Sequence, residues 1–238
     1  MSKIHLISGP RNISTALMYS FGNRADMSIV DEPFYAYYLD THPQIDHPGK
    51  SEILEALPTS FDKVLDTYIH KPYPTAHAFF KNMAHHLDGA DWEFIKSLKN
   101  LFLVRDPSQL IASFAEVIPN PTMLDIGLKL EYELMQYLIE NDKEVIVLDS
   151  NVLLQDPPRI LRLLCDKLDI PFSEEMLAWE SGPRAADGVW AKYWYANVWG
   201  STGFSKQKTS SRVFPERCRG LLEEAQFYYE GLREYAIR

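Results

Sequence analysis

Five short apolar runs, separated by segments long enough to form helices, constrain the fold of this 238-residue chain more than any other feature. Continuous apolar runs of this length are typical of strands that are covered on both faces. Because strands that alternate with helices build parallel sheets, the sequence predicts a single α/β domain over residues 1–238, with a central parallel β-sheet flanked by helices. The predicted strands are Lys3 to Ser8, Met27 to Val30, His77 to Lys81, Asn100 to Val104 and Glu144 to Leu148.

The helical patterns between and after these runs predict how the sheet is covered. Beyond residue 148 the pattern is mainly helical and ends in a helix from Pro215 to Tyr235, so we expect a helical C-terminal part around the sheet. Two segments without periodicity, 42–50 and 186–212, are predicted to be a surface excursion and a long loop. The earlier helices are predicted at Ser14 to Phe21, Phe61 to Ile69, Trp92 to Leu98, Pro107 to Val117 and Thr122 to Glu140.

Composition excludes several classes of protein. Hydrophobic residues at 46% and charged residues at 24% are typical of a globular chain. A net charge of -9 argues against a nucleic-acid partner, so any bound anion needs a local basic site. The apolar runs are far shorter than the roughly 20 residues of a membrane-spanning helix. With two unpaired cysteines and no signal-like segment, we expect a cytoplasmic protein without a metal site.

The turn after the first predicted strand, Ser8-Gly-Pro-Arg-Asn-Ile-Ser-Thr15, is placed where α/β proteins bind phosphate groups. Backbone N–H groups and the positive end of the helix dipole attract anions there. The turn lacks the second Gly and the Lys of a Walker A loop, which disfavours hydrolysis of ATP or GTP. Arg11 together with Ser14 and Thr15 therefore predicts either an anion cradle or an ordinary capped helix.

A second basic element ends the fourth predicted strand. Arg105 is followed by Asp106-Pro107, and Ser113 lies eight residues beyond Arg105 on the helix that Pro107 begins. The arginine and the serine are expected to converge on one phosphate group.

With these two motifs the chain resembles the sulfotransferase family, whose members use 3'-phosphoadenosine 5'-phosphosulfate (PAPS) as sulfuryl donor. Asp31-Glu-Pro-Phe34 is similar to the Glu-Pro that follows the second strand in many bacterial members, and the segment 149–172 is similar to the family's strand, Asp-Pro turn and helix. The four motifs follow the family's order. The resemblance implies a P-loop-like sulfotransferase fold and transfer of a sulfuryl group to a hydroxyl or amine of a small acceptor, with no metal required.

The resemblance also implies a cofactor site. Arg11 would bridge the 5'-phosphate and the sulfuryl group, while Arg105 and Ser113 would bind the 3'-phosphate. Asn12 and Ile13 stand where the family usually has Gly, which predicts a tighter turn. A basic stretch after residue 205 loosely matches the family's basic cofactor loop. The implied cofactor-binding residues are Gly9, Arg11, Asn12, Ile13, Ser14, Thr15, Arg105, Ser113, Lys206 and Lys208.

Besides Arg11 as the catalytic cation, two kinds of side chain are candidates for the base that deprotonates the acceptor. Glu32 follows the second strand, and Pro33 favours an extended backbone that directs Glu32 toward the ligand crevice. His85 and His86 follow the third strand, where many family members carry a catalytic His; because two adjacent histidines cannot both point the same way, at most one is expected to be the base. We favour Glu32, whose reference pKa of about 4.3 predicts activity that is flat through neutral pH.

Two other functions stay open at this point. A nucleotide-binding phosphoryl transferase or kinase uses the same kind of sheet, and a sulfotransferase-like module can bind its ligand without catalysis. Lys81 and the aromatic residues of 190–204 are secondary site candidates, with core packing the favoured role of the rings. The net acidity favours a neutral sugar, lipid or small aromatic alcohol as acceptor over a polyanionic glycan. The oligomeric state is not encoded.

Overall fold

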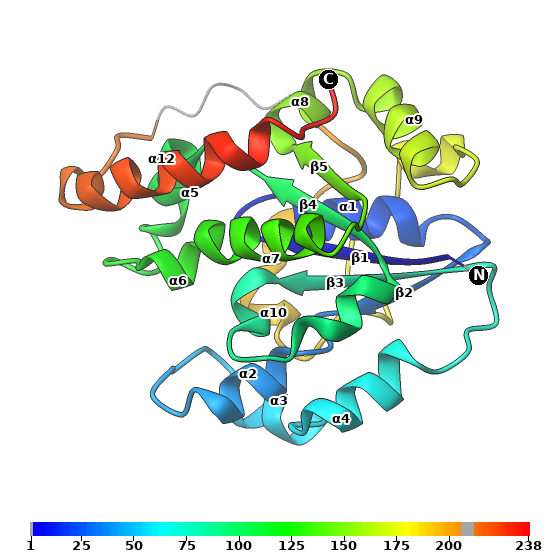
Figure 1. Cartoon of the computed structure of the whole chain (residues 1–238), viewed down its shortest axis with the longest axis horizontal. Coiled ribbons are helices and arrows are strands. Elements are labelled where there is room, and N and C mark those ends of the chain that lie inside the picture. Colours follow the sequence, from blue (N-terminus) through cyan, green and yellow to red (C-terminus); the bar gives the residue numbers. More distant parts are fainter. Residues whose placement is uncertain (1, 206–211) are drawn as a thin grey trace.

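The computed structural model describes residues 2–205 and 212–238. Five parallel strands form one sheet in the order β2-β3-β1-β4-β5, so the predicted α/β class is confirmed (Figure 1). All five predicted runs are strands, with bounds shifted by one or two residues. The strands are β1 (Ser2–Ser8), β2 (Met27–Asp31), β3 (His77–Met83), β4 (Lys99–Val104) and β5 (Val145–Asp149).

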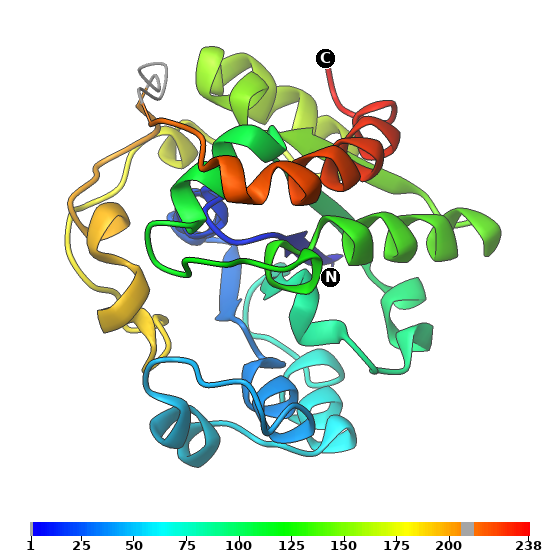
Figure 2. The ribbon, with the colours of Figure 1, turned by 90° about the vertical axis from the view of Figure 1, so that its left-hand side faces the viewer.

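Helices cover both faces of the sheet, because the strands carry apolar side chains on both faces. Ile4 and Leu6 of β1 pack into one buried cluster, and Ile7 packs into the other. The first cluster is closed by α1 (Ser14–Gly22), α8 (Ser150–Gln155) and α9 (Pro157–Lys167). The second is closed by α5 (Pro107–Phe114), α7 (Leu128–Glu140) and α12 (Arg219–Arg233), which lie together in Figures 1 and 2.

A third group of helices extends past the β2 edge of the sheet (Figure 1). It contains α2 (Tyr35–Thr41), α3 (Lys50–Ala56), α4 (Phe61–Val64) and the π turn η1 (Leu65–Ile69). Two short helices, α10 (Ala191–Trp194) and α11 (Ala196–Trp199), belong to the segment predicted as a loop. Buried Tyr35 and Tyr38 of α2 pack with Trp190 and Tyr195, so aromatic packing orders a stretch that has no helical period.

Several predicted helices have different bounds in the structure; the one predicted from Pro107 to Val117, for example, ends at Phe114. The run Thr122 to Glu140 is divided into α6 (Met123–Ile126) and α7 by Gly127, whose φ of 78° ends α6 in the left-handed conformation. The run Pro215 to Tyr235 opens with a 3-10 turn, η5 (Glu216–Cys218), before α12. Three further 3-10 turns are η2 (Ala84–Leu87), η3 (Trp92–Ser97) and η4 (Glu174–Leu177).

Three remaining expectations concern cysteines, metals and membranes. Cys165 and Cys218 are free and buried. Within residues 2–205 and 212–238, no His, Cys, Asp and Glu side chains form a group of three or more that could hold a metal ion. None of the described helices combines the length and the apolar character needed to cross a membrane.

Candidate active site

A cavity of about 440 Å³ lies at the carboxyl ends of the strands, where ligands bind in open α/β sheets. Turns that follow β1, β2, β3 and β4 contribute to its wall, together with the α10–α11 segment. Lys206 and Lys208, which were predicted to touch the cofactor, lie outside the described residues. The other predicted residues in its wall are Arg11, Asn12, Ile13, Ser14, Thr15, Glu32, His85, His86, Arg105 and Ser113.

The β1–α1 turn has a strained backbone, and its residues 10–16 line the cavity. Arg11 and Ile13 have φ values of 57° and 56°, although neither is glycine, and a β-branched residue such as Ile13 is rare in this conformation. Ile13 precedes α1 without a side-chain cap, and the first turn of α1 contains no acidic residue. Its first N–H groups therefore stay available to an anion, and backbone strain of this kind concentrates at ligand sites.

Asn12 and Gly9 stabilise this turn through contacts with neighbouring elements outside the cavity. The Asn12 side chain is buried, and its amide donates to the carbonyl oxygen of Leu103 in β4. A side chain at Gly9 would collide with the carbonyl oxygen of Ile126, which ends α6. Asn12 thus fixes the turn to the sheet, and Gly9 permits the close approach of α6 without itself lining the cavity.

Three arginines converge on one side of the cavity. Arg105 donates from Nη1 to the carbonyl oxygen of Arg11 at 2.7 Å, and Arg11 donates from Nε to Oγ of Ser113 at 3.2 Å. Arg212 also lines the cavity and pairs with Glu116 at 3.0 Å. Burial, together with the charge of Arg212, lowers the pKa of both Arg11 and Arg105. The two predicted phosphate motifs are therefore in direct contact, and together with Arg212 they form the local basic site that an acidic chain needs.

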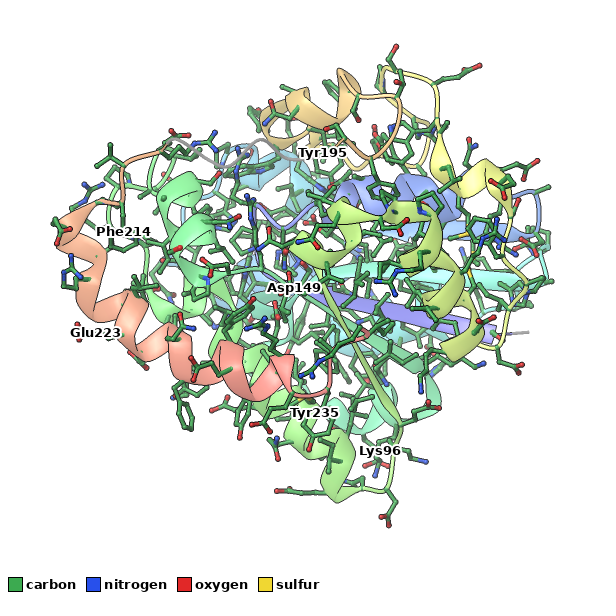
Figure 3. The ribbon with its side chains drawn as sticks, turned by 90° about the horizontal axis from the view of Figure 1, so that it is seen from above. Lys96, Asp149, Tyr195, Phe214, Glu223 and Tyr235 are labelled. Carbon is green, nitrogen blue, oxygen red and sulfur yellow. The ribbon has the colours of Figure 1, made fainter. Side chains whose placement is uncertain are left out.

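A buried network of opposite charge lies at the ends of β2 and β3. The ammonium of Lys81 is fully buried and donates to Oδ1 of Asp31 at 3.0 Å, to the hydroxyl of Tyr195 at 2.8 Å and to Oε1 of Glu32. Tyr195, which lies between α10 and α11 (Figure 3), donates to Oδ2 of Asp31 at 2.7 Å. Burial, opposed by the Lys81 charge, raises the pKa of Glu32 to about 7. Although burial opposes it, the two carboxylates raise the pKa of Lys81, so this ammonium stays charged.

The backbone of Glu32 differs from the extended conformation expected before Pro33. Its φ is 41°, because the chain turns directly from β2 into α2. The turn is held by the Glu32 N–H, which donates to the carbonyl oxygen of Lys81 at 2.7 Å, and by the Tyr35 N–H, which donates to the Glu32 carbonyl oxygen at 3.0 Å. Glu32 nonetheless lines the cavity. The expectation of an unshifted pKa was also wrong, because burial was not visible in the sequence.

Both histidines after β3 line the cavity, where at most one was expected to be the base. The tight 3-10 turn η2 sets the rings of His85 and His86 perpendicular, with centroids 4.6 Å apart. Burial and neighbouring histidines lower the pKa of His85 to about 3 and that of His86 well below 6.5. Among the described residues, Nδ1 of each ring has no hydrogen-bond partner, and Nδ1 of His86 lies 3.9 Å from Oε2 of Glu32. Both rings are thus neutral at physiological pH.

The family model of the sulfotransferase domain matches residues 2–236. The chain belongs to the sulfotransferase domain family. It is 37% identical over 233 residues to branched-chain-amino-acid aminotransferase-like protein 1 of Arabidopsis thaliana, and 36% identical over 234 residues to protein 2 of that name. Each alignment covers 98% of this chain but 42% of the relative, so the chain spans less than half the length of these curated relatives.

Solved structures of sulfotransferase domains share the fold at low sequence identity. The domain of the Synechococcus PCC 7002 olefin synthase aligns with a TM-score of 0.59 and 17% identity, covering 94% of each chain. The domain from the curacin biosynthetic pathway aligns with a TM-score of 0.55 and 14% identity, covering 94% of this chain and 97% of that one. The resemblance that rested on four motifs is therefore confirmed at the level of the family and the fold.

In this sulfotransferase domain, sequence reasoning overlooked several cavity residues. Arg212 was noted only as part of a basic stretch, and Tyr195 only as one ring in an aromatic segment. Lys81 was ranked as a secondary candidate, although it lies near the carboxyl end of β3, opposite the end of β2 that Glu32 follows. His47 and Asp125 line the cavity but drew no attention. An available signal was the position of Asp31 and Lys81 at the ends of two apolar runs.

Proposed function

We propose that this chain is a sulfotransferase that moves a sulfuryl group from PAPS to a hydroxyl or amine of a small acceptor. One observation carries the proposal: a single cavity has three guanidinium groups and an uncapped helix N-terminus on one side, and a buried carboxylate on the other. PAPS brings two phosphate groups and a sulfuryl group. Several fixed cations and free N–H groups suit such a multiply charged anion.

The donor set supports separate assignments for the two ends of PAPS. We assign Arg11 and the first N–H groups of α1 to the 5'-phosphosulfate, and Arg105 with Ser113 to the 3'-phosphate. The contact between Arg11 and Ser113 couples the two positions, so binding at one end helps to orient the other. Gly9 and Asn12 act indirectly by positioning the turn.

The same residues support a transfer mechanism. The acceptor oxygen or nitrogen forms a bond to sulfur while the bond from sulfur to the bridging 5'-phosphate oxygen breaks, and adenosine 3',5'-bisphosphate leaves. Arg11 stabilises the charge that develops on the leaving phosphate. Glu32 takes the acceptor proton, because a pKa raised to about 7 suits a base at neutral pH better than imidazoles whose pKa lies far lower.

A ligand-binding comparison tests the proposal. Adenosine 3',5'-bisphosphate at a hundred times its Kd should stabilise the chain by about 2.7 kcal/mol, measured by thermal shift, whereas ATP with Mg²⁺ should stabilise it less. Arg105→Ala should lose most of the shift. Arg217→Ala serves as the matched control, because this side chain donates to the Pro119 carbonyl oxygen and does not line the cavity.

Each other result points to another function. A larger shift with ATP and Mg²⁺ would favour a phosphoryl transferase. Binding of the bisphosphate without sulfuryl transfer to any member of a panel of alcohols, phenols and amines would favour a binding module.

A further inference from the structure

The part of the cavity around Glu32, which we call the acceptor half, differs in charge from the part around Arg11, Arg105 and Arg212, which we call the arginine half. The charge of Arg212 bears on Arg11, whereas the charges of Lys81 and Asp31 bear on Glu32. The acceptor half therefore has its own electrostatic environment, and this environment favours acceptors of one charge over those of another.

Five rings in the wall of this half form what we call the aromatic box: Tyr35, His47, His85, His86 and Trp194. Tyr35 stacks on His86 with centroids 4.3 Å apart, and its hydroxyl lies 2.8 Å from Nδ1 of His47. His47 meets Trp194 and His85 edge-on, at 6.4 Å and 6.2 Å between centroids. The rings come from α2, the segment before α3, η2 and α10, so four parts of the chain converge on this box.

The aromatic box carries no positive charge of its own, and a carboxylate lies beside it. Burial lowers the pKa of His47, as it does for His85 and His86, so these rings are neutral. Asp125 of α6 also lines the cavity, and its charge acts on His47. Oδ2 of Asp125 accepts from the N–H and the hydroxyl of Thr122, each at 2.7 Å, which fixes the carboxylate in place. Tyrosine and tryptophan rings, such as Tyr35 and Trp194, attract cations, and a fixed carboxylate beside them adds to that attraction.

We propose that the acceptor is a cationic alcohol or phenol, whose ammonium group lies in the aromatic box near Asp125 while its hydroxyl meets Glu32. This inference rests on the proposed sulfotransferase function. A protonated amine has no lone pair for attack on sulfur, so the hydroxyl is the group that receives the sulfuryl. The ammonium of Lys81 already donates to Asp31, Glu32 and Tyr195, so an anionic acceptor would lose water beside two carboxylates without gaining a free cationic partner, which makes its binding unfavourable.

Three phenols of similar size test the inference because they differ in charge. The probes are tyramine, which is cationic, para-propylphenol, which is neutral, and para-hydroxyphenylacetate, which is anionic. Their Kd values are measured by calorimetry on the full chain saturated with adenosine 3',5'-bisphosphate. We expect tyramine to bind at least about tenfold more tightly than para-propylphenol, and the acid to bind least. The kcat/KM values for sulfuryl transfer should follow the same order.

Asp125→Asn is the informative variant, because Asn can still accept the Thr122 hydrogen bonds while losing the charge. It should remove most of the advantage of tyramine over para-propylphenol and change the affinity for para-propylphenol much less than that for tyramine. Asp142→Asn is the matched control: Asp142 is exposed, has a φ of 57° that Asn tolerates, and does not line the cavity. This control should keep the full preference for tyramine.

The outcomes separate this inference from the proposed function. Equal affinity for tyramine and para-propylphenol, tighter binding of the acid, or no binding of any probe at millimolar concentration would overturn the cationic acceptor, even if the bisphosphate binds. These comparisons use the wild-type chain and do not depend on the folding of a variant. Failure of the bisphosphate itself to bind would refute the proposed function and, with it, this inference.

Discussion

The two sides of the cavity satisfy their charged groups in opposite ways. On the arginine side, Arg11 and Arg105 hydrogen-bond to a hydroxyl and a carbonyl oxygen, which orient the guanidinium groups without neutralising them. On the acidic side, Lys81 already contacts two carboxylates and one hydroxyl. The arginine side can therefore accept the negative charge of a ligand, whereas the contacts on the acidic side set the protonation of Glu32.

Burial makes the acidic side the more fragile of the two. Removal of one partner from a buried ion pair leaves an uncompensated charge and typically costs about 3–5 kcal/mol. Lys81 has no exposed surface, and Glu32 is only 4% exposed. Tests of this side therefore need substitutions that keep the shape of the side chain.

Glu32→Gln is expected to have the largest effect, because it removes the proposed base from the acidic side and leaves the arginine side intact. Turnover should fall by about 10²- to 10⁴-fold, the usual contribution of general base catalysis, while the Kd for adenosine 3',5'-bisphosphate stays unchanged. Steady-state kinetics and calorimetry measure the two quantities. A variant that keeps most of its turnover would show that Glu32 is not the base.

His85→Asn and His86→Asn are the matched comparison for Glu32. Each should reduce turnover less than Glu32→Gln does, because a neutral ring of low pKa is a weak base. A dead histidine variant beside an active Glu32→Gln would reverse the assignment.

Arg11→Ala should have the next largest effect and probes the arginine side. Turnover should fall by about 10²- to 10³-fold, because the charge of Arg11 is needed most while the bond from sulfur to the phosphate oxygen breaks. The KM for the acceptor should change much less, and Arg11→Lys should restore part of the turnover. Retention of near-wild-type turnover by Arg11→Ala would favour the binding-module alternative.

Arg105→Ala should act on cofactor binding. Loss of one charge-assisted contact should weaken adenosine 3',5'-bisphosphate by about 1.5–3 kcal/mol in calorimetry. Adenosine 5'-phosphate should weaken by less, though not by zero, because Arg105 also holds the carbonyl oxygen of Arg11. Equal losses for the two ligands would contradict the assignment of Arg105 to the 3'-phosphate.

Much of the arginine side was predictable, because its residues lie next to strand ends in the sequence. Apolar runs gave all five strands, and the carboxyl ends of parallel strands meet at one edge, which brings Arg11 and Arg105 together. The contact between them was not predictable, because it depends on the left-handed backbone of Arg11 and Ile13. Only the tertiary structure selects such a conformation for residues other than glycine.

The acidic side was less predictable, because its partners come from distant segments. Tyr195 lies 114 positions from Lys81 in the chain, inside a stretch that lacks helical periodicity. The α2 helix was missed because Tyr35-Ala-Tyr-Tyr38 is apolar on every side. Burial by these segments is also what shifts the pKa of Glu32 and the two histidines.

The smallest predicted effect is a change in the pH dependence of turnover, and it decides which group on the acidic side is the base. Glu32 must be deprotonated to accept a proton, so kcat/KM of the wild-type chain should fall as the pH drops through about 7 and reach a plateau above it. The histidines stay neutral far below this range and would give a flat profile there. The structure thus reverses the assignment expected from reference pKa values, in which a carboxylate base gave the flat profile.

Tyr195→Phe should move the acid limb to higher pH. The Tyr195 hydroxyl lies 3.4 Å from Oε1 of Glu32 and lowers the pKa of that carboxyl, so its removal raises the pKa further. Loss of a hydrogen bond as long as this one, worth about 1 kcal/mol, corresponds to a shift of less than about one pKa unit. The variant should therefore lose several-fold in kcat/KM near pH 7 and much less on the plateau. Tyr193→Phe is the control in the helix α10 that directly precedes Tyr195, since the Tyr193 hydroxyl contacts Glu52 outside the network. An acid limb that stays in place in Tyr195→Phe, or moves equally in Tyr193→Phe, would exclude Glu32 as its origin.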